Sequence, residues 1–152
     1  MKKHVTITCV AIIGLAVALA GCATGGKKLS PEELVMQQTQ AFTNDFLAAN
    51  VDNFLNYISD SFTNDRVQSK AEIAEHIKTA KEKGRVAEGA QWIKDNNGKI
   101  DLANAKVTVT GDKATVYPIV ASADMGSVTV ELTFVKDPDK VWRICGINVE
   151  GV

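Results

Sequence analysis

The sequence predicts an α+β domain in which three helices pack on one face of a curved antiparallel sheet of four or more strands. Apolar residues recur at three- and four-residue steps between positions 31 and 83, as in amphipathic helices. From residue 100 to residue 149 they alternate with polar residues, and short turn signals divide this stretch. The 152 residues suffice for one such domain and a targeting segment.

The first 22 residues carry the targeting signal. A basic start, Met1-Lys2-Lys3-His4, precedes an apolar run over residues 5–20, which is shorter than the ~20 residues that cross a bilayer. Leu19-Ala20-Gly21-Cys22 then resembles the lipobox of bacterial lipoproteins. This resemblance implies a signal peptide over residues 1–21, lipid on Cys22 and a tether over residues 22–29. The domain would cover residues 30–152.

Lipid on Cys22 would place the protein in the cell envelope. Two or three acyl chains anchor a protein stably, whereas a single chain holds it only marginally. Ala23 resembles the default signal for the outer membrane in bacteria with two membranes, where the domain would face the periplasm. With a single membrane, the same motif implies its outer face.

Composition excludes several function classes. Seventeen basic and 18 acidic residues give a net charge of -1, which removes the electrostatic case for a nucleic-acid partner. After removal of residues 1–21, Cys145 is the one thiol besides Cys22, so no intramolecular disulfide is expected. His76 is then the single histidine, which excludes a histidine-rich zinc site. We expect neither a metal nor a cofactor.

Capping signals mark the three helices. Ser30 as N-cap, Pro31 in the first turn and Glu33 predict a helix that extends to residue 50. Asp52 can cap a second, shorter helix, and Ser69 opens a third helix with a second capping box. Lysines 78, 81 and 83 near the end of the third helix suit its dipole and predict a solvated face.

Four strands are predicted near residues 100–110, 114–123, 128–136 and 141–149, whereas residues 85–98 give no clear pattern. Pro118 lies inside the second strand and implies a sheet edge or a bulge. In the third strand the apolar face that begins at Val128 is predicted to be core. The opposite face, with Glu131, is predicted to be solvent-exposed or to form a dimer surface.

The order of these elements resembles the NTF2-like superfamily, which includes the ketosteroid isomerases and the SnoaL proteins. The matching stretches are Phe46-Leu47-Ala48-Ala49, residues 54–62, residues 107–116 and Val141-Trp142-Arg143-Ile144. The resemblance implies a cone of helices and curved sheet around an apolar pocket. Because some members are enzymes and many are binding modules, the fold does not choose the function.

The resemblance to ketosteroid isomerases ends at the oxyanion hole. Asp65 stands five residues after Asp60, as the catalytic base of those enzymes does after the acidic end of helix two. Their two oxyanion donors align with Phe46 and Val130, which have no donor. Since such donors supply several kcal/mol of barrier lowering, an isomerase activity is not expected.

A second enzyme class in the superfamily, the dehydratases, uses a His–Asp pair with tyrosines. Asp65 with His76 or Tyr117 is the matching set here, and it leaves a dehydratase or hydrolase as an alternative function. Each residue also has a structural interpretation: a turn residue for Asp65, a half-exposed helical histidine for His76 and a strand residue for Tyr117.

Phe46, Tyr57 and Trp142 are the candidates to line the pocket, because large apolar side chains need burial. Cys145 is expected to be a small buried residue and not a reactive thiolate. The sequence favours a non-catalytic, membrane-tethered domain that binds a small apolar ligand or a protein partner. A lipid-anchored enzyme, and a structural envelope protein that forms homodimers through its sheet face, are the alternatives.

Overall fold

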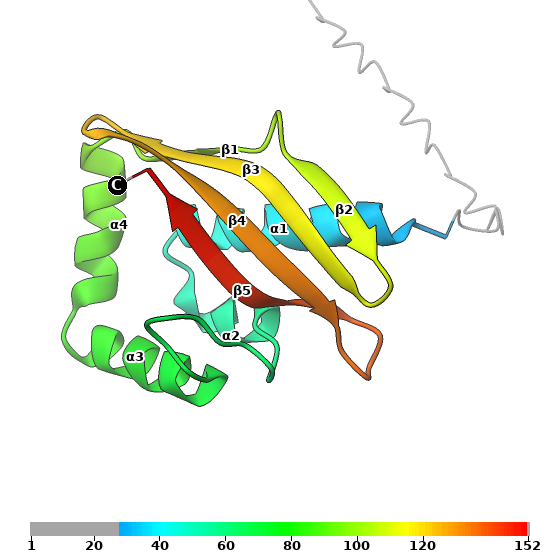
Figure 1. Cartoon of the computed structure of the whole chain (residues 1–152). Helices are drawn as coiled ribbons and strands as arrows, with labels where there is room; N and C mark the ends of the chain where they lie inside the picture. Colours follow the sequence, from blue (N-terminus) through cyan, green and yellow to red (C-terminus); the bar gives the residue numbers. More distant parts are fainter. Residues whose placement is uncertain (1–27, 152) are drawn as a thin grey trace, which may run out of the picture.

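The computed structural model describes residues 28–151, so the predicted signal peptide, Cys22 and most of the tether lie outside the described residues. Four α-helices precede the sheet, as Figure 1 shows: α1 (Pro31–Leu47), α2 (Phe54–Tyr57), α3 (Lys70–Glu82) and α4 (Arg85–Asp95). A 3-10 helix, η1 (Val51–Asn53), separates α1 from α2. Five strands follow: β1 (Lys99–Asp101), β2 (Lys106–Thr110), β3 (Lys113–Ala123), β4 (Gly126–Lys136) and β5 (Trp142–Glu150).

Helix α1 begins as the capping signal predicts. The Ser30 hydroxyl accepts a hydrogen bond from the Glu33 N–H at 3.1 Å, and the Glu33 carboxylate accepts one from the Ser30 N–H at 2.7 Å. The helix ends at Leu47, and Ala49 follows with a φ of 53°. Its buried face consists of Val35, Thr39 and Thr43.

The second and third helices differ from the prediction in detail. Asp52 lies within η1 and caps no helix, because its carboxylate pairs with Lys81 of α3. Ser69 caps α3 and accepts from the Glu72 N–H at 3.3 Å. The Glu72 carboxylate, however, accepts from the Gln68 N–H, one residue upstream of the expected partner.

Helix α4 occupies most of the stretch without a clear sequence pattern. Its N-cap is Gly84, whose φ of 71° is accessible to glycine at little cost. Neither α3 nor α4 contains a fully buried residue. Their apolar faces, which include Ile73 and Ile93, are only half-buried.

The sheet is antiparallel, and β3 lies at its centre between β4 and a pair of short strands. The predicted strand over residues 100–110 is two strands, β1 and β2, which both pair with β3. A turn between them contains the hydrogen bond from the Ala105 N–H to the Leu102 carbonyl. Pro118 lies at a register shift in β3, so it forms a bulge and not an edge.

A second bulge bends β5. Phe134 pairs with Ile144 and Thr133 pairs with Gly146, which leaves Cys145 as the extra residue. Cys145 is therefore only half-buried, where the sequence predicted a buried residue, and burial raises the pKa of its thiol. Arg143 and Cys145 lie on the outer face, opposite Trp142 and Ile144.

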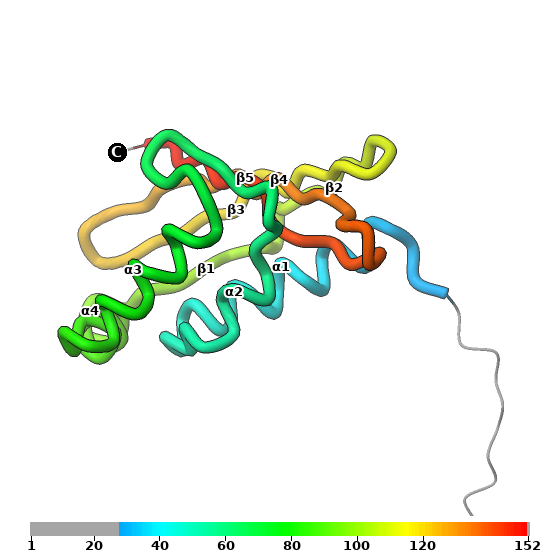
Figure 2. The backbone as a smooth tube through the Cα atoms, turned by 90° about the horizontal axis from the view of Figure 1, so that it is seen from below, coloured from blue at the N-terminus to red at the C-terminus, as the bar shows by residue number. Residues whose placement is uncertain are grey.

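The core lies between the sheet and α1. In the described part of the chain, the four helices lie on one side of the sheet and none lies over the other side (Figure 2). The predicted apolar face of β4 does point inward: Leu132 and Phe134 are buried, and Val128 and Val130 are half-buried. The buried apolar residues are Val35, Ile58, Phe62, Ala114, Val116, Ile119, Leu132, Phe134, Trp142 and Ile144.

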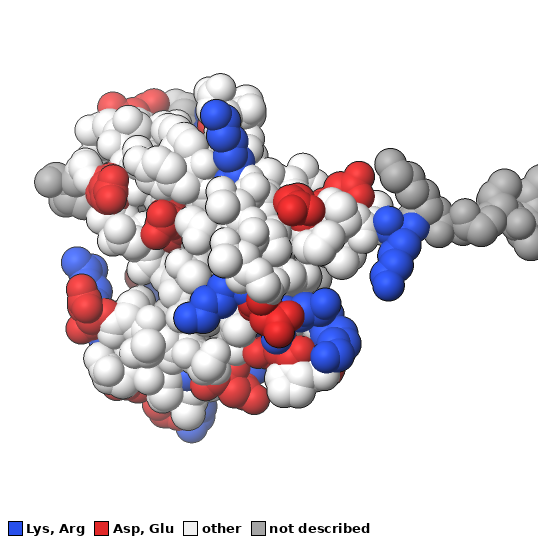
Figure 3. Space-filling view, turned by 45° about the vertical axis from the view of Figure 1, so that its right-hand side comes forward, with Lys and Arg blue, Asp and Glu red and all other residues white. Residues whose placement is uncertain are grey.

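The described surface carries mixed charge. Figure 3 shows acidic and basic side chains interspersed over the visible face. Within residues 28–151, no helix is long and apolar enough to cross a bilayer. The same residues contain no cluster of His, Cys, Asp and Glu that could hold a metal ion.

Candidate functional site

An apolar pocket of about 550 Å³ lies where the sheet, α4 and the end of α1 meet. Three large side chains on its rim are unusually exposed: Phe46 by 45%, Trp92 by 48% and Met125 by 79%. Exposed apolar groups gathered in one place are typical of binding sites. The remaining lining residues are Gly98, Lys99, Ile100, Ala121, Ser122, Ala123, Gly126, Ser127, Val128 and Gly151.

The floor of this apolar pocket is the inner face of the sheet near the β3–β4 turn. Ala121 pairs with Val128 on one side and with Ile100 on the other, so these three side chains share a face. Ala123 lies two residues further along β3 on the same face. Because alanine side chains are small, the sheet leaves open space here, whereas Leu132 and Phe134 fill the space nearer α1.

Two contacts hold α4 beside the pocket. The Asn97 side-chain amide donates to both carboxylate oxygens of Asp124 at 3.0 Å, which joins the end of α4 to the β3–β4 turn. The Gly98 N–H donates to the Ile93 carbonyl at 2.7 Å. A Cβ atom at Gly98 would lie 2.9 Å from the Ile93 Cγ2 atom, so glycine permits this close approach. Trp92 is thereby held at the rim.

Phe46 is positioned by aromatic packing at the end of α1. Its ring stacks on that of Phe54 with centroids 6.2 Å apart, and Phe54 contacts Phe42 at 5.5 Å. Such pairs contribute about 1 kcal/mol each beyond burial of their area. The α1–α2 junction therefore keeps one face of Phe46 directed to the pocket rim.

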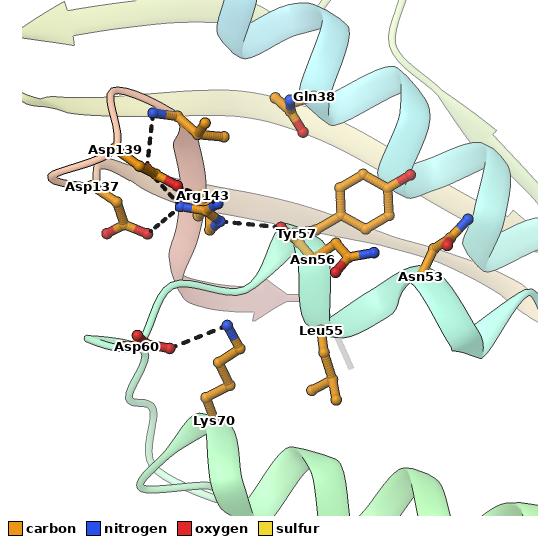
Figure 4. Close-up of a pocket in the computed structure, with 11 residues that line it drawn as sticks. Gln38, Asn53, Leu55, Asn56, Tyr57, Asp60, Lys70, Asp137, Asp139 and Arg143 are labelled. Atoms are coloured by element: carbon orange, nitrogen blue, oxygen red, sulfur yellow. Dashed lines mark hydrogen bonds and ion pairs between the residues drawn. The ribbon is translucent and has the colours of Figure 1, made fainter.

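A second cavity, of about 680 Å³, is polar and lies around Arg143 (Figure 4). The guanidinium donates to Asp137 at 2.9 Å, to Asp139 at 2.7 Å and, through Nε, to the Asn56 carbonyl at 3.3 Å. The hydrogen bond with Arg143 holds the pKa of Asp139 below its usual range. Asp137 also accepts from the Ser59 hydroxyl. These hydrogen bonds use four of the five N–H donors of Arg143, which acts as a brace between the β4–β5 turn and α2.

Tyr57 lines this polar cavity and donates its O–H to Asp45 of α1 at 2.7 Å. That hydrogen bond lowers the pKa of Asp45 and raises the pKa of Tyr57. Asn50 and Asn53 donate to the same carboxylate. Asp60 pairs with Lys70 at 3.1 Å at the other end of the cavity. The charged groups here are thus paired with one another.

The three candidate catalytic residues lie on separate elements. Asp65 is exposed in the loop before α3 and lines a third cavity beside β5. His76 is exposed on α3, and Tyr117 is 42% exposed at the bulge of β3, opposite Lys106. None of the three cavities described here contains two of these side chains. In the described residues they are not brought together.

The three candidate pocket residues separate as well. Phe46 lines the apolar pocket, Tyr57 lines the polar cavity, and Trp142 is 3% exposed in the core. Sequence reasoning did not single out Trp92 or Met125. Trp92 lies in the stretch without a clear sequence pattern, and Met125 lies in the short turn between β3 and β4.

No protein-family model matches this sequence, and no curated protein matches it. Among solved structures, a candidate ketosteroid isomerase from Shewanella frigidimarina aligns with a TM-score of 0.55 and 16% identity, over 75% of this chain and 92% of that one. An NTF2-like superfamily protein from Salmonella enterica aligns with a TM-score of 0.50 and 15% identity, over 77% and 87% of the two chains.

The Bdellovibrio bacteriovorus protein Bd1075 aligns with a TM-score of 0.51 and 8% identity, over 78% of this chain. This chain spans only 39% of the length of Bd1075. At such identities the likeness concerns the fold alone. The helices, the curved antiparallel sheet and these neighbours together show that the described part of the chain has the NTF2-like fold.

Proposed function

We propose that this chain is a membrane-anchored lipoprotein whose NTF2-like domain binds a small apolar ligand and does not catalyse a reaction. The observation that carries the proposal is the apolar pocket with its exposed rim of Phe46, Trp92 and Met125. Burial of the exposed part of each rim side chain would contribute on the order of 1 kcal/mol. Three such contacts favour an apolar ligand over a polar one.

The placement of the catalytic candidates favours binding over catalysis. An acid–base pair must lie within hydrogen-bond reach of one substrate, and Asp65, His76 and Tyr117 lie on three separate elements. Among the described residues, the lining of the apolar pocket contains one charged residue, Lys99, and two serines, Ser122 and Ser127. This lining offers no carboxylate or imidazole as a base.

Membrane anchoring is supported by the sequence of residues 1–22, where a basic start and a short apolar run precede Leu19-Ala20-Gly21-Cys22. Labelled palmitate supplied to cells that make the protein should enter the wild-type chain, which should sediment with membranes. Cys22→Ser should abolish both results, and the matched variant Cys145→Ser should retain both. Equal labelling of wild type and Cys22→Ser would refute the anchor.

Ligand binding is tested on residues 27–152, which include the whole described core. A native mass spectrum before and after organic extraction should show a removable adduct of a few hundred daltons. A spectrum without an adduct would favour a structural role over ligand binding. The same spectrum reports whether the chain is a monomer or a dimer.

Tryptophan fluorescence gives a second test, because the chain has two tryptophans and Trp142 is buried. An apolar ligand should shield Trp92 from acrylamide. Ala121→Leu, which fills the floor of the pocket, should weaken that protection. Ala87→Leu changes an exposed residue of α4 outside the pocket lining and should leave the protection unchanged.

A further inference from the structure

Strand β5 forms one edge of the sheet, and the chain itself covers only the first half of that edge. The segment after α2 runs alongside β5: Ile58 forms a parallel bridge with Ile144, and the Ser59 N–H donates to the Ile144 carbonyl at 2.9 Å. The Thr63 N–H then donates to the Cys145 carbonyl at 3.3 Å. Ile58 and Ser59 therefore pair with β5 as an extended chain would, and a turn in which the Phe62 N–H donates to the Ser59 carbonyl precedes the contact at Thr63.

The covering segment leaves the edge at Asn64. The Asn64 side-chain oxygen accepts from the backbone N–H groups of Arg66 and Val67, at 2.8 and 2.7 Å. The backbone N–H of Asn64 donates to the Val67 carbonyl. This turn directs the chain away from β5 and toward α3. Between the turn and the second half of β5 lies a groove of about 600 Å³, lined by Thr63, Asn64, Asp65, Arg66, Thr133, Gly146, Ile147, Asn148 and Val149.

The backbone of β5 offers hydrogen-bonding groups to this groove. The Asp137 N–H donates to the Val141 carbonyl, so the backbone groups of Val141 face β4. In an antiparallel pair the backbone N–H and C=O groups of successive residues face the partner strand and the opposite side in turn. The Ile144 carbonyl faces away from β4, as this alternation requires, and accepts from the Ser59 N–H. Beyond the bulge at Cys145 the alternation directs the N–H and C=O groups of Ile147 and Val149 to the edge. Within residues 28–151, no hydrogen bond satisfies them.

We propose that this groove, the β5 edge groove, binds an extended peptide segment of a partner protein, which adds to β5 beyond the point where residues 58–63 leave it. Adjacent strands lie about 4.8 Å apart, so the partner segment would continue the line of the chain's own segment. Main-chain hydrogen bonds would supply affinity, as in other cases of strand addition.

The groove also indicates the chemistry of the segment. Val149, which is 50% exposed, and Ile147 lie on the inner face of the sheet, while Asn148 lies on the outer face near Arg66. A strand beside them would place alternate side chains on the two faces. The favoured segment therefore alternates apolar and polar residues.

Amide hydrogen exchange of the full mature chain, followed residue by residue by NMR, tests the groove. In the protein alone, the amides of Ile147 and Val149 should exchange fast, and that of Asn148, directed to β4, should exchange slowly. The probe is a blocked peptide, Lys-Val-Thr-Val-Thr, which is the sequence of β2. At ten times its dissociation constant it should slow exchange of the two edge amides about tenfold.

A variant and a control peptide separate strand addition from nonspecific contact. Val149→Pro removes an edge-facing N–H without loss of a bond to β4 and should weaken peptide binding about fivefold to tenfold, relative to Val149→Ala. The probe with proline at its second valine should bind as weakly. The proposal is overturned if millimolar probe leaves the amides of Ile147, Val149 and residues 64–66 unperturbed. It is also overturned if those two amides are protected in the protein alone and lose that protection on dilution, since a second copy would then occupy the edge.

Discussion

Within residues 28–151, the indole N–H of Trp142 has no hydrogen-bond partner, although the side chain is only 3% exposed. A buried donor without a partner costs about 1–3 kcal/mol of stability. Phenylalanine lacks the indole nitrogen and two of the ring carbons, so Trp142→Phe removes this cost. The lost carbons withdraw about 1.5 kcal/mol of apolar burial, and the small cavity adds to that loss. We therefore expect Trp142→Phe to change the free energy of unfolding by less than about 1 kcal/mol.

Phe134→Leu provides the matched control, because Phe134 is 1% exposed and has no polar atom in its side chain. It loses three carbons with no compensating gain, which corresponds to a loss of about 2 kcal/mol. Urea unfolding followed by far-UV circular dichroism measures both variants. A loss in Trp142→Phe as large as that in Phe134→Leu would refute the reasoning and would indicate a buried water bound to the indole.

Three further predictions concern the helix cap, the charged brace and the glycine beside α4. Ser30→Ala should lower the free energy of unfolding by about 1 kcal/mol, measured by thermal unfolding. The pKa of Asp139 is lowered in the folded state by Arg143, so its contribution is present above the ordinary carboxyl pKa and is lost as pH falls through the lowered value. When the free energy of unfolding is measured as pH is lowered, Asp139→Asn should show a smaller decrease than the wild type. An equal decrease in both proteins would contradict this prediction. Gly98→Ala should cost about 1–3 kcal/mol, because its Cβ would press on Ile93, and should speed amide exchange in α4.

The fold was predictable because its signals are local. The Ser30 capping box, the alternation in β4 and the proline bulge each depend on a few neighbouring residues. Helix α4 was missed because Gly84 at its N-cap offers no side-chain capping signal and Gly89 interrupts its interior, so no start signal of the kind found at Ser30 and Ser69 marks it. The turn between β1 and β2 was missed for a related reason: Leu102 and Ala105 continue the apolar pattern across it.

The candidate site was less predictable than the fold, because its parts come from distant positions. Phe46 follows the apolar period of α1, and that period predicts an inward side chain. The helix extends beyond the filled part of the core, so this last apolar position meets open space and not the sheet. Likewise, Asp65 stands at the spacing of a catalytic base, yet it lines the cavity beside β5 and not the apolar pocket. Spacing along the chain does not determine which cavity a loop residue reaches.

Helix α1 also separates the two ends of the domain. It begins one residue after Ser30, at the end that leads to the tether, and Phe46, near its other end, lines the apolar pocket. At 1.5 Å per residue its 17 residues span about 25 Å. The end of α1 that leads to the proposed anchor at Cys22 is therefore separated from the apolar pocket by the length of the helix, so lipid on Cys22 would not occupy the pocket entrance directly.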